Sequence, residues 1–99
     1  VDQHGQVLRQ YGKQPGEKLS WPYHIIQHST GVLLIADCRN HRVVLLSDEA
    51  RLLQSISADH VRYPWTLHLD EQAGLLCVTE GGIFTSDPMK VFQFHPHPV

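Results

Sequence analysis

The triplet Trp21-Pro22-Tyr23 opens an apolar stretch, and an aromatic–Pro–aromatic triplet returns 42 positions later as Tyr63-Pro64-Trp65. Downstream of the triplets, Gly31–Asp37 matches Gly74–Glu80 at an offset of 43. In both copies a glycine precedes an apolar run that ends in a carboxylate. A repeat at this spacing indicates an architecture built from similar units that lie side by side.

Two further segments repeat with nearly the same period. Arg42–Leu46 matches Lys90–Phe94 at an offset of 48, and Gly5–Tyr11 matches Ala50–Ile56 at an offset of 45. The larger offset places five extra residues in Gly81–Met89, between two apolar runs. The repeated unit is therefore about 42–45 residues long, with local insertions.

Each unit is predicted to contain four short strands. Runs of five or six residues rich in Val, Ile and Leu alternate with polar, hairpin-sized turns. The runs of the complete unit are 23–27, 32–37, 42–46 and 51–56. No stretch of 11 or more residues shows helical periodicity. We therefore predict an all-β fold, since four antiparallel strands repeated at this period are typical of a β-propeller blade.

The chain is expected to form a partial β-propeller of about two four-stranded antiparallel blades. Residues 1–20 hold the last strand of a preceding blade, near Gln6–Tyr11, and an inter-blade loop. Residues 21–62 form a complete blade, 63–94 a degenerate three-stranded blade, and 95–99 a tail. A propeller closes with about 4–8 blades. The open blade edges of this chain are therefore expected to favour self-association.

Several residues of the complete blade follow a known order: Pro22 before an apolar strand, then Ile35-Ala36-Asp37, then Asn40-His41-Arg42 before Val43-Val44. This order resembles an NHL repeat. The last blade departs from the pattern, because Glu80 replaces the aspartate and the Asn-His-Arg element is absent. A degenerate, three-stranded final blade is similar to the C-terminal end of NHL propellers in tripartite-motif proteins. In those propellers the missing strand comes from the propeller's own N-terminus.

The resemblance implies a non-catalytic recognition module. In tripartite-motif proteins of this type the propeller selects the target of a ubiquitin ligase or RNA regulator. Any ligase chemistry lies in an upstream zinc-binding module that the present sequence lacks, so the chain itself is not expected to be an enzyme. Some NHL-type propellers are metal-dependent lyases that act on peptide ends, which is a third alternative.

Structural roles are predicted for the residues that recur at turns. Gly31 and Gly74 suit positive φ in a tight turn. Proline fixes φ where the chain enters a strand. Asp37 is expected to accept hydrogen bonds from backbone N–H groups of the next turn, and Arg42 to form a forked pair with it. The complete structural set is Pro22, Gly31, Asp37, Asn40, His41, Arg42, Pro64 and Gly74.

The formal net charge is −2, from 8 Lys and Arg against 10 Asp and Glu. This balance excludes a basic coat over the whole chain, of the kind that binds nucleic acid or anionic membranes. Propeller geometry places alternate connections on opposite faces. We call the face with connections 12–21, 38–42, 57–63 and 81–90 the upper face, and predict that it is basic. The lower face is predicted to be acidic, through Asp2, Asp48, Glu49, Asp70 and Glu71.

The candidate binding surface lies on the upper face, where aromatic residues adjoin basic ones. Such a mixture suits a protein hot spot, and it also suits base stacking and phosphate contacts. A protein partner is therefore the first prediction and RNA the alternative. The aromatic residues also fit a purely structural role between blades. The candidates are Lys13, Lys18, Trp21, Arg39, Arg42, Arg62 and Tyr63.

The cysteines and histidines predict no metal site and no cofactor. Cys38 and Cys77 lack Cys-x-x-Cys spacing, so both are predicted to be reduced and at least half-buried, in a cytoplasmic protein. Arg39 beside Cys38 is expected to lower the pKa of that thiol somewhat. The pairs His24/His28 and His95/His97 have no nearby Cys or carboxylate to complete a tetrahedral site.

A membrane partner is not expected. The longest apolar run, Val32–Ala36, is far shorter than the roughly 20 residues of a membrane-spanning helix.

Overall fold

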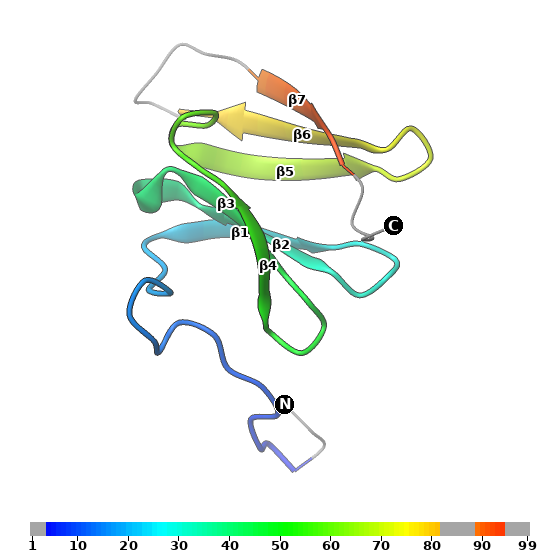
Figure 1. Cartoon of the computed structure of the whole chain (residues 1–99). Coiled ribbons are helices and arrows are strands. Elements are labelled where there is room, and N and C mark those ends of the chain that lie inside the picture. The colour runs from blue at the N-terminus through cyan, green and yellow to red at the C-terminus, as the bar shows by residue number, and fades with distance from the viewer. Residues whose placement is uncertain (1–3, 82–88, 95–99) are drawn as a thin grey trace.

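Two antiparallel sheets make up the computed structural model, which describes residues 4–81 and 89–94 (Figure 1). The four-stranded sheet, here sheet 1, contains β1 (Pro22–Gln27), β2 (Leu33–Asp37), β3 (Arg42–Leu46) and β4 (Leu52–Ile56). The three-stranded sheet, sheet 2, contains β5 (Pro64–Asp70), β6 (Leu75–Glu80) and β7 (Met89–Gln93). A single 3₁₀ turn, η1 (Cys38–Asn40), joins β2 to β3. No α-helix occurs in the described ranges.

Each sheet is a simple meander, with its strands hydrogen-bonded in chain order. The all-β prediction is confirmed, and the two open meanders form a partial β-propeller. Strand bounds differ from the predicted ones by only one residue in the complete blade. Both prolines of the repeated triplets begin a strand: Pro22 opens β1 and Pro64 opens β5. Gly31 and Gly74 adopt positive φ, as predicted.

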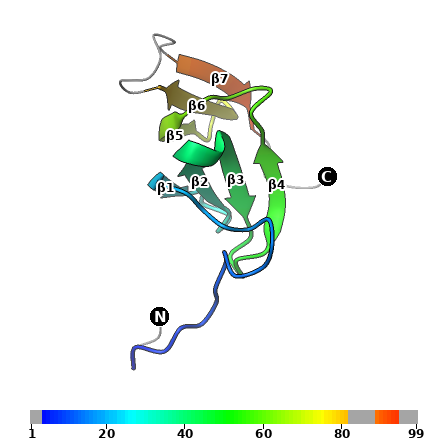
Figure 2. The ribbon, with the colours of Figure 1, turned by 90° about the vertical axis from the view of Figure 1, so that its left-hand side faces the viewer.

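The main core lies between the two sheets, which stack face to face (Figure 2). Alternate residues of each strand point into it, as the period of two in a β-strand requires. In β6, for example, Leu76 and Val78 are buried, whereas Leu75 and Cys77 are only half-buried. The buried core cluster is Val32, Leu34, Ala36, Val43, Leu45, Val61, Leu67, Leu76, Val78 and Phe94.

A second apolar cluster covers the opposite face of sheet 1, which we call its far face. Ile35, Val44 and Leu46 are buried there. Tyr11 and Leu19, from the segment before β1, pack against this cluster. The N-terminal segment therefore lies on the far face of sheet 1, and sheet 2 covers the other face (Figure 1).

The strand predicted near Gln6–Tyr11 does not form, because residues 6–11 belong to neither sheet. A strand needs a hydrogen-bonded neighbour, and the sheet that this one would complete precedes β1 in the propeller order. The described residues provide no such neighbour. The prediction is wrong for this segment, because a strand-like sequence pattern alone does not provide a pairing partner.

Alternate connections lie at opposite ends of the sheets (Figure 1). The turns at 28–31, 47–50 and 71–74 share one end, which is the lower face. The 3₁₀ turn η1 and the connection 57–63 share the other end, the upper face. On the lower face the first turns of the two sheets are joined, because the backbone N–H and the hydroxyl of Ser29 donate to Glu71. Most of the connection 81–90 lies outside the described residues, as does the tail.

Candidate functional site

Two buried carboxylates organise the upper face. Asp37 ends β2 and Glu80 ends β6, and their side chains are almost completely shielded from water. Asp37 Oδ1 accepts a hydrogen bond from the backbone N–H of Ser20 at 2.7 Å, and Glu80 Oε2 accepts one from the backbone N–H of Arg62. Each carboxylate thus holds the residue just before an aromatic–Pro–aromatic triplet. In each sheet, the carboxylate at the end of the second strand therefore holds the backbone at the start of the first strand.

Each carboxylate also has a cation beside it. Arg42 Nε donates to Asp37 Oδ2 at 2.7 Å, and Lys90 Nζ lies 3.2 Å from Glu80 Oε1. Lys90 aligns with Arg42 in the repeat, so the degenerate blade keeps the ion pair although it lacks the Asn-His-Arg element. Lys90 Nζ also donates to the carbonyl of His60 at 2.9 Å. The second pair therefore ties β7 to the connection between the sheets.

Arg42 is occupied inside the fold. Its Nη1 and Nη2 donate to the carbonyls of Gly16 and Lys18, each at 3.2 Å. The predicted contact with Asp37 is present, but it runs through Nε alone and is not forked, because the other two nitrogens reach the loop before β1. Asn40 Nδ2 also donates to Asp37 and to Lys18, each at 2.8 Å. Asp37 itself accepts from the backbone of Ser20, not from the turn that follows it.

A stack of rings crosses the upper edge of both sheets. The rings of Tyr23 and Trp65 stack at 4.3 Å, and the ring of Trp21 meets Tyr23 edge-on at 6.0 Å. The guanidinium carbon of Arg39 lies 4.5 Å from the centre of the Trp21 ring, which is a cation–π arrangement. Trp65 and Tyr23 join β5 to β1, so they hold the sheets together. Trp21 remains 52% exposed.

Tyr63 lies opposite this stack and closes a small cavity. His41 Nδ1 accepts from the backbone N–H of Tyr63 at 3.0 Å, and the two rings meet edge-on at 4.2 Å. Trp21, Arg39 and Tyr63 line a cavity of about 110 Å³ together with the buried Cys38. We call this site the rim pocket.

The backbone is strained at two of the residues that line the rim pocket. Trp21 has φ 55° and Tyr63 has φ 44°, values that residues with a side chain rarely adopt. Such a conformation costs about 1–3 kcal/mol and persists only where the surroundings hold it. Here the Trp21 carbonyl accepts from the N–H of Cys38 at 3.3 Å, and the Tyr63 carbonyl accepts from the N–H of Gly81 at 2.8 Å. Sequence reasoning missed this strain, although proline after each aromatic residue already disfavours its helical conformation.

The structure brings three of the predicted binding residues together, and these are the three in the rim pocket. Arg42, from the same list, is held by Asp37 and the loop before β1. Lys13, Lys18 and Arg62 are exposed, but they are not among the residues that line the pocket.

Cys38 is the thiol in the rim pocket, and its environment favours the protonated form. Burial raises the pKa of Cys38, the negative charge of Asp37 raises it further, and Arg39 lowers it by less. Arg39 lowers the pKa as expected, but burial and Asp37 outweigh it, so the net change is a rise in the pKa of Cys38. A protonated thiol is a poor nucleophile. Cys38 and Cys77 are both free thiols, as predicted.

The described histidines act mainly as hydrogen-bonding groups. His24 Nδ1 accepts from the backbone N–H of Leu67 at 2.8 Å, which joins the sheets across β1 and β5. His28 contacts Thr30 and lies 3.3 Å from Glu71. In residues 4–81 and 89–94 no group of three or more His, Cys, Asp or Glu side chains could hold a metal ion. His95 and His97 lie outside these ranges.

Comparison with known proteins adds no assignment: no family model matches the chain, and no curated protein matches it. No helix in the described part of the chain is long and apolar enough to cross a membrane.

Proposed function

We propose that this chain is a non-catalytic recognition module that binds a protein partner at the rim pocket. The observation that carries the proposal is the exposed Trp21 ring, with the Arg39 guanidinium 4.5 Å above it and Tyr63 across the cavity. Trp, Tyr and Arg are the residue types enriched at the energetic centres of protein interfaces.

Pre-organisation supports the same proposal. Hydrogen bonds within the chain hold the strained backbone at Trp21 and Tyr63. Ring contacts with Tyr23 and His41 orient the two side chains before any partner arrives. A side chain that is already ordered loses less conformational entropy on binding, and the binding free energy improves accordingly. The guanidinium of the exposed Arg39 lies over the Trp21 ring, and a carboxylate is a preferred acceptor for guanidinium N–H groups. We therefore propose an acidic segment of a protein as the partner.

RNA binding through the same face is a second candidate, favoured by the Arg39–Trp21 stack, on which a base can also stack. Phosphate contacts depend on the number of available cations, and Arg42 and Lys90 are engaged with buried carboxylates. Lys13, Lys18 and Arg62 remain exposed, but none of them lines the rim pocket beside Arg39. Few basic side chains are therefore available for phosphate contacts at the rim pocket, which supports a protein partner as the first choice.

The experiment compares capture of cell proteins by the wild-type chain and by Trp21→Ala, Arg39→Ala and a matched exposed control, Gln72→Ala. A specific partner is retained by the control and lost from both pocket variants. The purified partner should then bind each pocket variant at least about tenfold more weakly, a loss of about 1.4 kcal/mol or more. A set of captured proteins that is the same for all four chains would rule out the rim pocket as the binding site.

Single-stranded oligonucleotides of mixed sequence test the second candidate. RNA binding should weaken steeply with salt, by about one unit of log slope per phosphate contact. Arg39→Glu combined with Arg62→Glu should then abolish binding without unfolding the chain. Affinity that survives this double substitution would reject RNA recognition on the upper face.

The resemblance to NHL propellers of tripartite-motif proteins supports a wider proposal, in which this module selects the target of a ubiquitin ligase whose chemistry lies elsewhere. We further propose a cytoplasmic location, which two free cysteines support.

A further inference from the structure

The two sheets differ by one strand. Sheet 1 continues from β3 to β4, whereas sheet 2 ends at β7 among the described residues. The outer edge of β7 therefore presents backbone N–H and C=O groups that a further strand would pair with.

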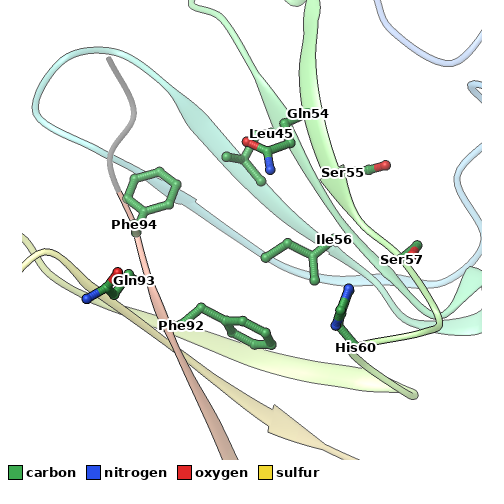
Figure 3. A pocket seen from close by; sticks show the side chains of 9 residues that line it. All are labelled: Leu45, Gln54, Ser55, Ile56, Ser57, His60, Phe92, Gln93 and Phe94. Atoms are coloured by element: carbon green, nitrogen blue, oxygen red, sulfur yellow. The ribbon is translucent and has the colours of Figure 1, made fainter. Parts of the chain in front are cut away.

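A pocket lined by both apolar and polar side chains lies beside this edge (Figure 3). Its volume is about 390 Å³. Leu45 and Ile56 of sheet 1 form one wall, and Phe92 and Phe94 form the other. A strand added to β7 would face β4 across the pocket, and every second side chain of that strand would point into it.

The chain contains a segment with the sequence of such a strand. Gly5–Tyr11 matches Ala50–Ile56, which contains β4, at an offset of 45. Residues 6–11 belong to neither sheet, and the side chains of Val7 and Leu8 are 67% and 57% exposed. Within the described residues, sheet 2 thus has no fourth strand, and the chain holds a segment with a fourth-strand sequence that lies in neither sheet.

The position of Tyr11 gives an independent argument. Tyr11 aligns with Ile56, and Ile56 at the end of β4 packs against the core between sheets 1 and 2. Tyr11 packs against Ile35, Val44 and Leu46 on the far face of sheet 1. Ile56 precedes sheet 2 in the chain and packs against the core that sheet 2 covers, and Tyr11 precedes sheet 1 and packs on its far face. Tyr11 therefore already lies where the fourth strand of a preceding blade would lie.

The same chain cannot easily use this segment to complete its own sheet 2. The segment lies on the far face of sheet 1, and sheet 2 lies on the other side. Both views of the molecule show the N-terminal end and β7 at opposite ends (Figures 1 and 2). A second copy of the chain can supply the strand that pairs with β7.

We propose that this chain assembles head to tail, with Val7–Tyr11 of one copy added to the free edge of β7 in a second copy. The far face of sheet 1 in the first copy packs at the same time on the outward face of sheet 2 in the second. Each copy then completes two four-stranded blades. The interface joins two different surfaces, so it closes into a ring or continues as a filament. With about 4–8 blades in a ring, two to four copies would close it. This inference does not rest on the rim pocket.

Exposed apolar side chains lie on both surfaces that the assembly would cover. Ile25 and Leu52 pair across the strands with the buried far-face residues Ile35 and Leu46. On the outward face of sheet 2, Val91 pairs with Cys77. Ile25, Leu52 and Val91 are each at least half exposed in the single chain. A second copy of the same chain supplies an apolar partner for each face.

Sedimentation velocity on the full chain tests the proposal over a roughly hundredfold concentration range, because assembly follows mass action. The wild type should form multiples of the single-chain mass. Leu8→Asp disables the donated segment and Val91→Asp the accepting sheet, so each should remain at the single-chain mass. Both residues are exposed in one copy, and circular dichroism should therefore be unchanged. Gln72→Asp adds the same charge on an exposed turn and should assemble as the wild type does.

Mixing the two variants gives the decisive result. Leu8→Asp keeps an intact β7 edge and Val91→Asp keeps an intact segment, so an equimolar mixture should form a pair of twice the single-chain mass. Three results would overturn the proposal: a wild type that stays at the single-chain mass, a Leu8→Asp chain that assembles like the wild type, or a mixture in which no pair forms.

Discussion

Lys90 Nζ lies 3.2 Å from the buried Oε1 of Glu80, at the place in sheet 2 that Arg42 and Asp37 occupy in sheet 1. The two pairs differ in their access to water, because the side chain of Lys90 is 42% exposed and that of Arg42 is 22% exposed. Water weakens the attraction between charges. The first pair should therefore contribute more to the stability of the chain than the second.

Replacing Asp37 by alanine should lower the free energy of unfolding by about 3–5 kcal/mol, because Arg42 is then left half-buried without its anion. The backbone N–H of Ser20 also loses its acceptor. Glu80→Ala should cost less, since water reaches Lys90. Urea unfolding of both variants measures the difference, with Asp59→Ala as a control that removes an exposed carboxylate. An Asp37→Ala chain as stable as this control would show that Asp37 does not anchor the turn.

His24 should stabilise the contact between the sheets through a single hydrogen bond. Its Nδ1 accepts from the backbone N–H of Leu67, and His24→Ala leaves that N–H without an acceptor. Loss of a partner at such a group costs about 1–3 kcal/mol. His68→Ala removes a histidine from an exposed position in β5 and is the matched control. Equal midpoints for the two variants in urea unfolding would contradict this role for His24.

Gly31 should tolerate alanine less well than Gly16 does. Both glycines have positive φ, 97° and 85° respectively, so alanine costs about 1–2 kcal/mol at either position. At Gly31 the added Cβ would also lie 3.2 Å from the Cβ of Asp48, whereas at Gly16 it meets nothing within 4 Å. Thermal unfolding should therefore show a larger loss for Gly31→Ala. A loss no greater than that of Gly16→Ala would mean that the turn at Asp48 gives way.

Glu71 should make the free energy of unfolding depend on pH in the acidic range. Hydrogen bonds from Ser29, chiefly from its hydroxyl, and the nearby His28 hold the pKa of Glu71 below its ordinary value of 4.5. The unfolded chain takes up this proton first as the pH falls. The stabilisation is therefore complete above pH 4.5 and declines as the pH falls through the lower, folded value.

Glu71→Gln tests this assignment, because glutamine cannot ionise. The melting temperature of the variant should fall less between neutral and acidic pH than that of the wild type. Glu49→Gln, at an exposed position in another turn of the lower face, serves as the control. If all three chains show the same acid dependence, the Ser29–Glu71 contact carries none of it.

The strands could be predicted closely because their signal is local. The repeated Gly31–Asp37 and Gly74–Glu80 segments carry both the apolar run and the turn that sets its start, and β2 and β6 fall on them. The segment Gln6–Tyr11 carries the same local signal but lies in no strand. Pairing is a long-range property, so no pattern within the segment reports it.

The candidate site was predictable only in part. The aromatic–Pro–aromatic triplets pointed to Trp21 and Tyr63, and neighbouring basic residues pointed to Arg39. Arg42 donates hydrogen bonds to the loop before β1 and is not available to a partner. The position of that loop cannot be predicted from the spacing of residues in the sequence. The role of His24 could have been predicted from the sequence. His24 lies two residues before the core-facing Ile26 in β1, so it shares the buried face, where a polar group needs a hydrogen-bonding partner.

The stack of Tyr23 on Trp65 gives this chain a built-in optical reporter. Trp65 is half-buried at the seam between the sheets, and its fluorescence should respond when they separate. Trp21 emits from the rim, where a soluble quencher reaches it more readily. Quenching resolved at the two tryptophans would therefore follow separation of the sheets and occupation of the rim pocket in one unlabelled sample.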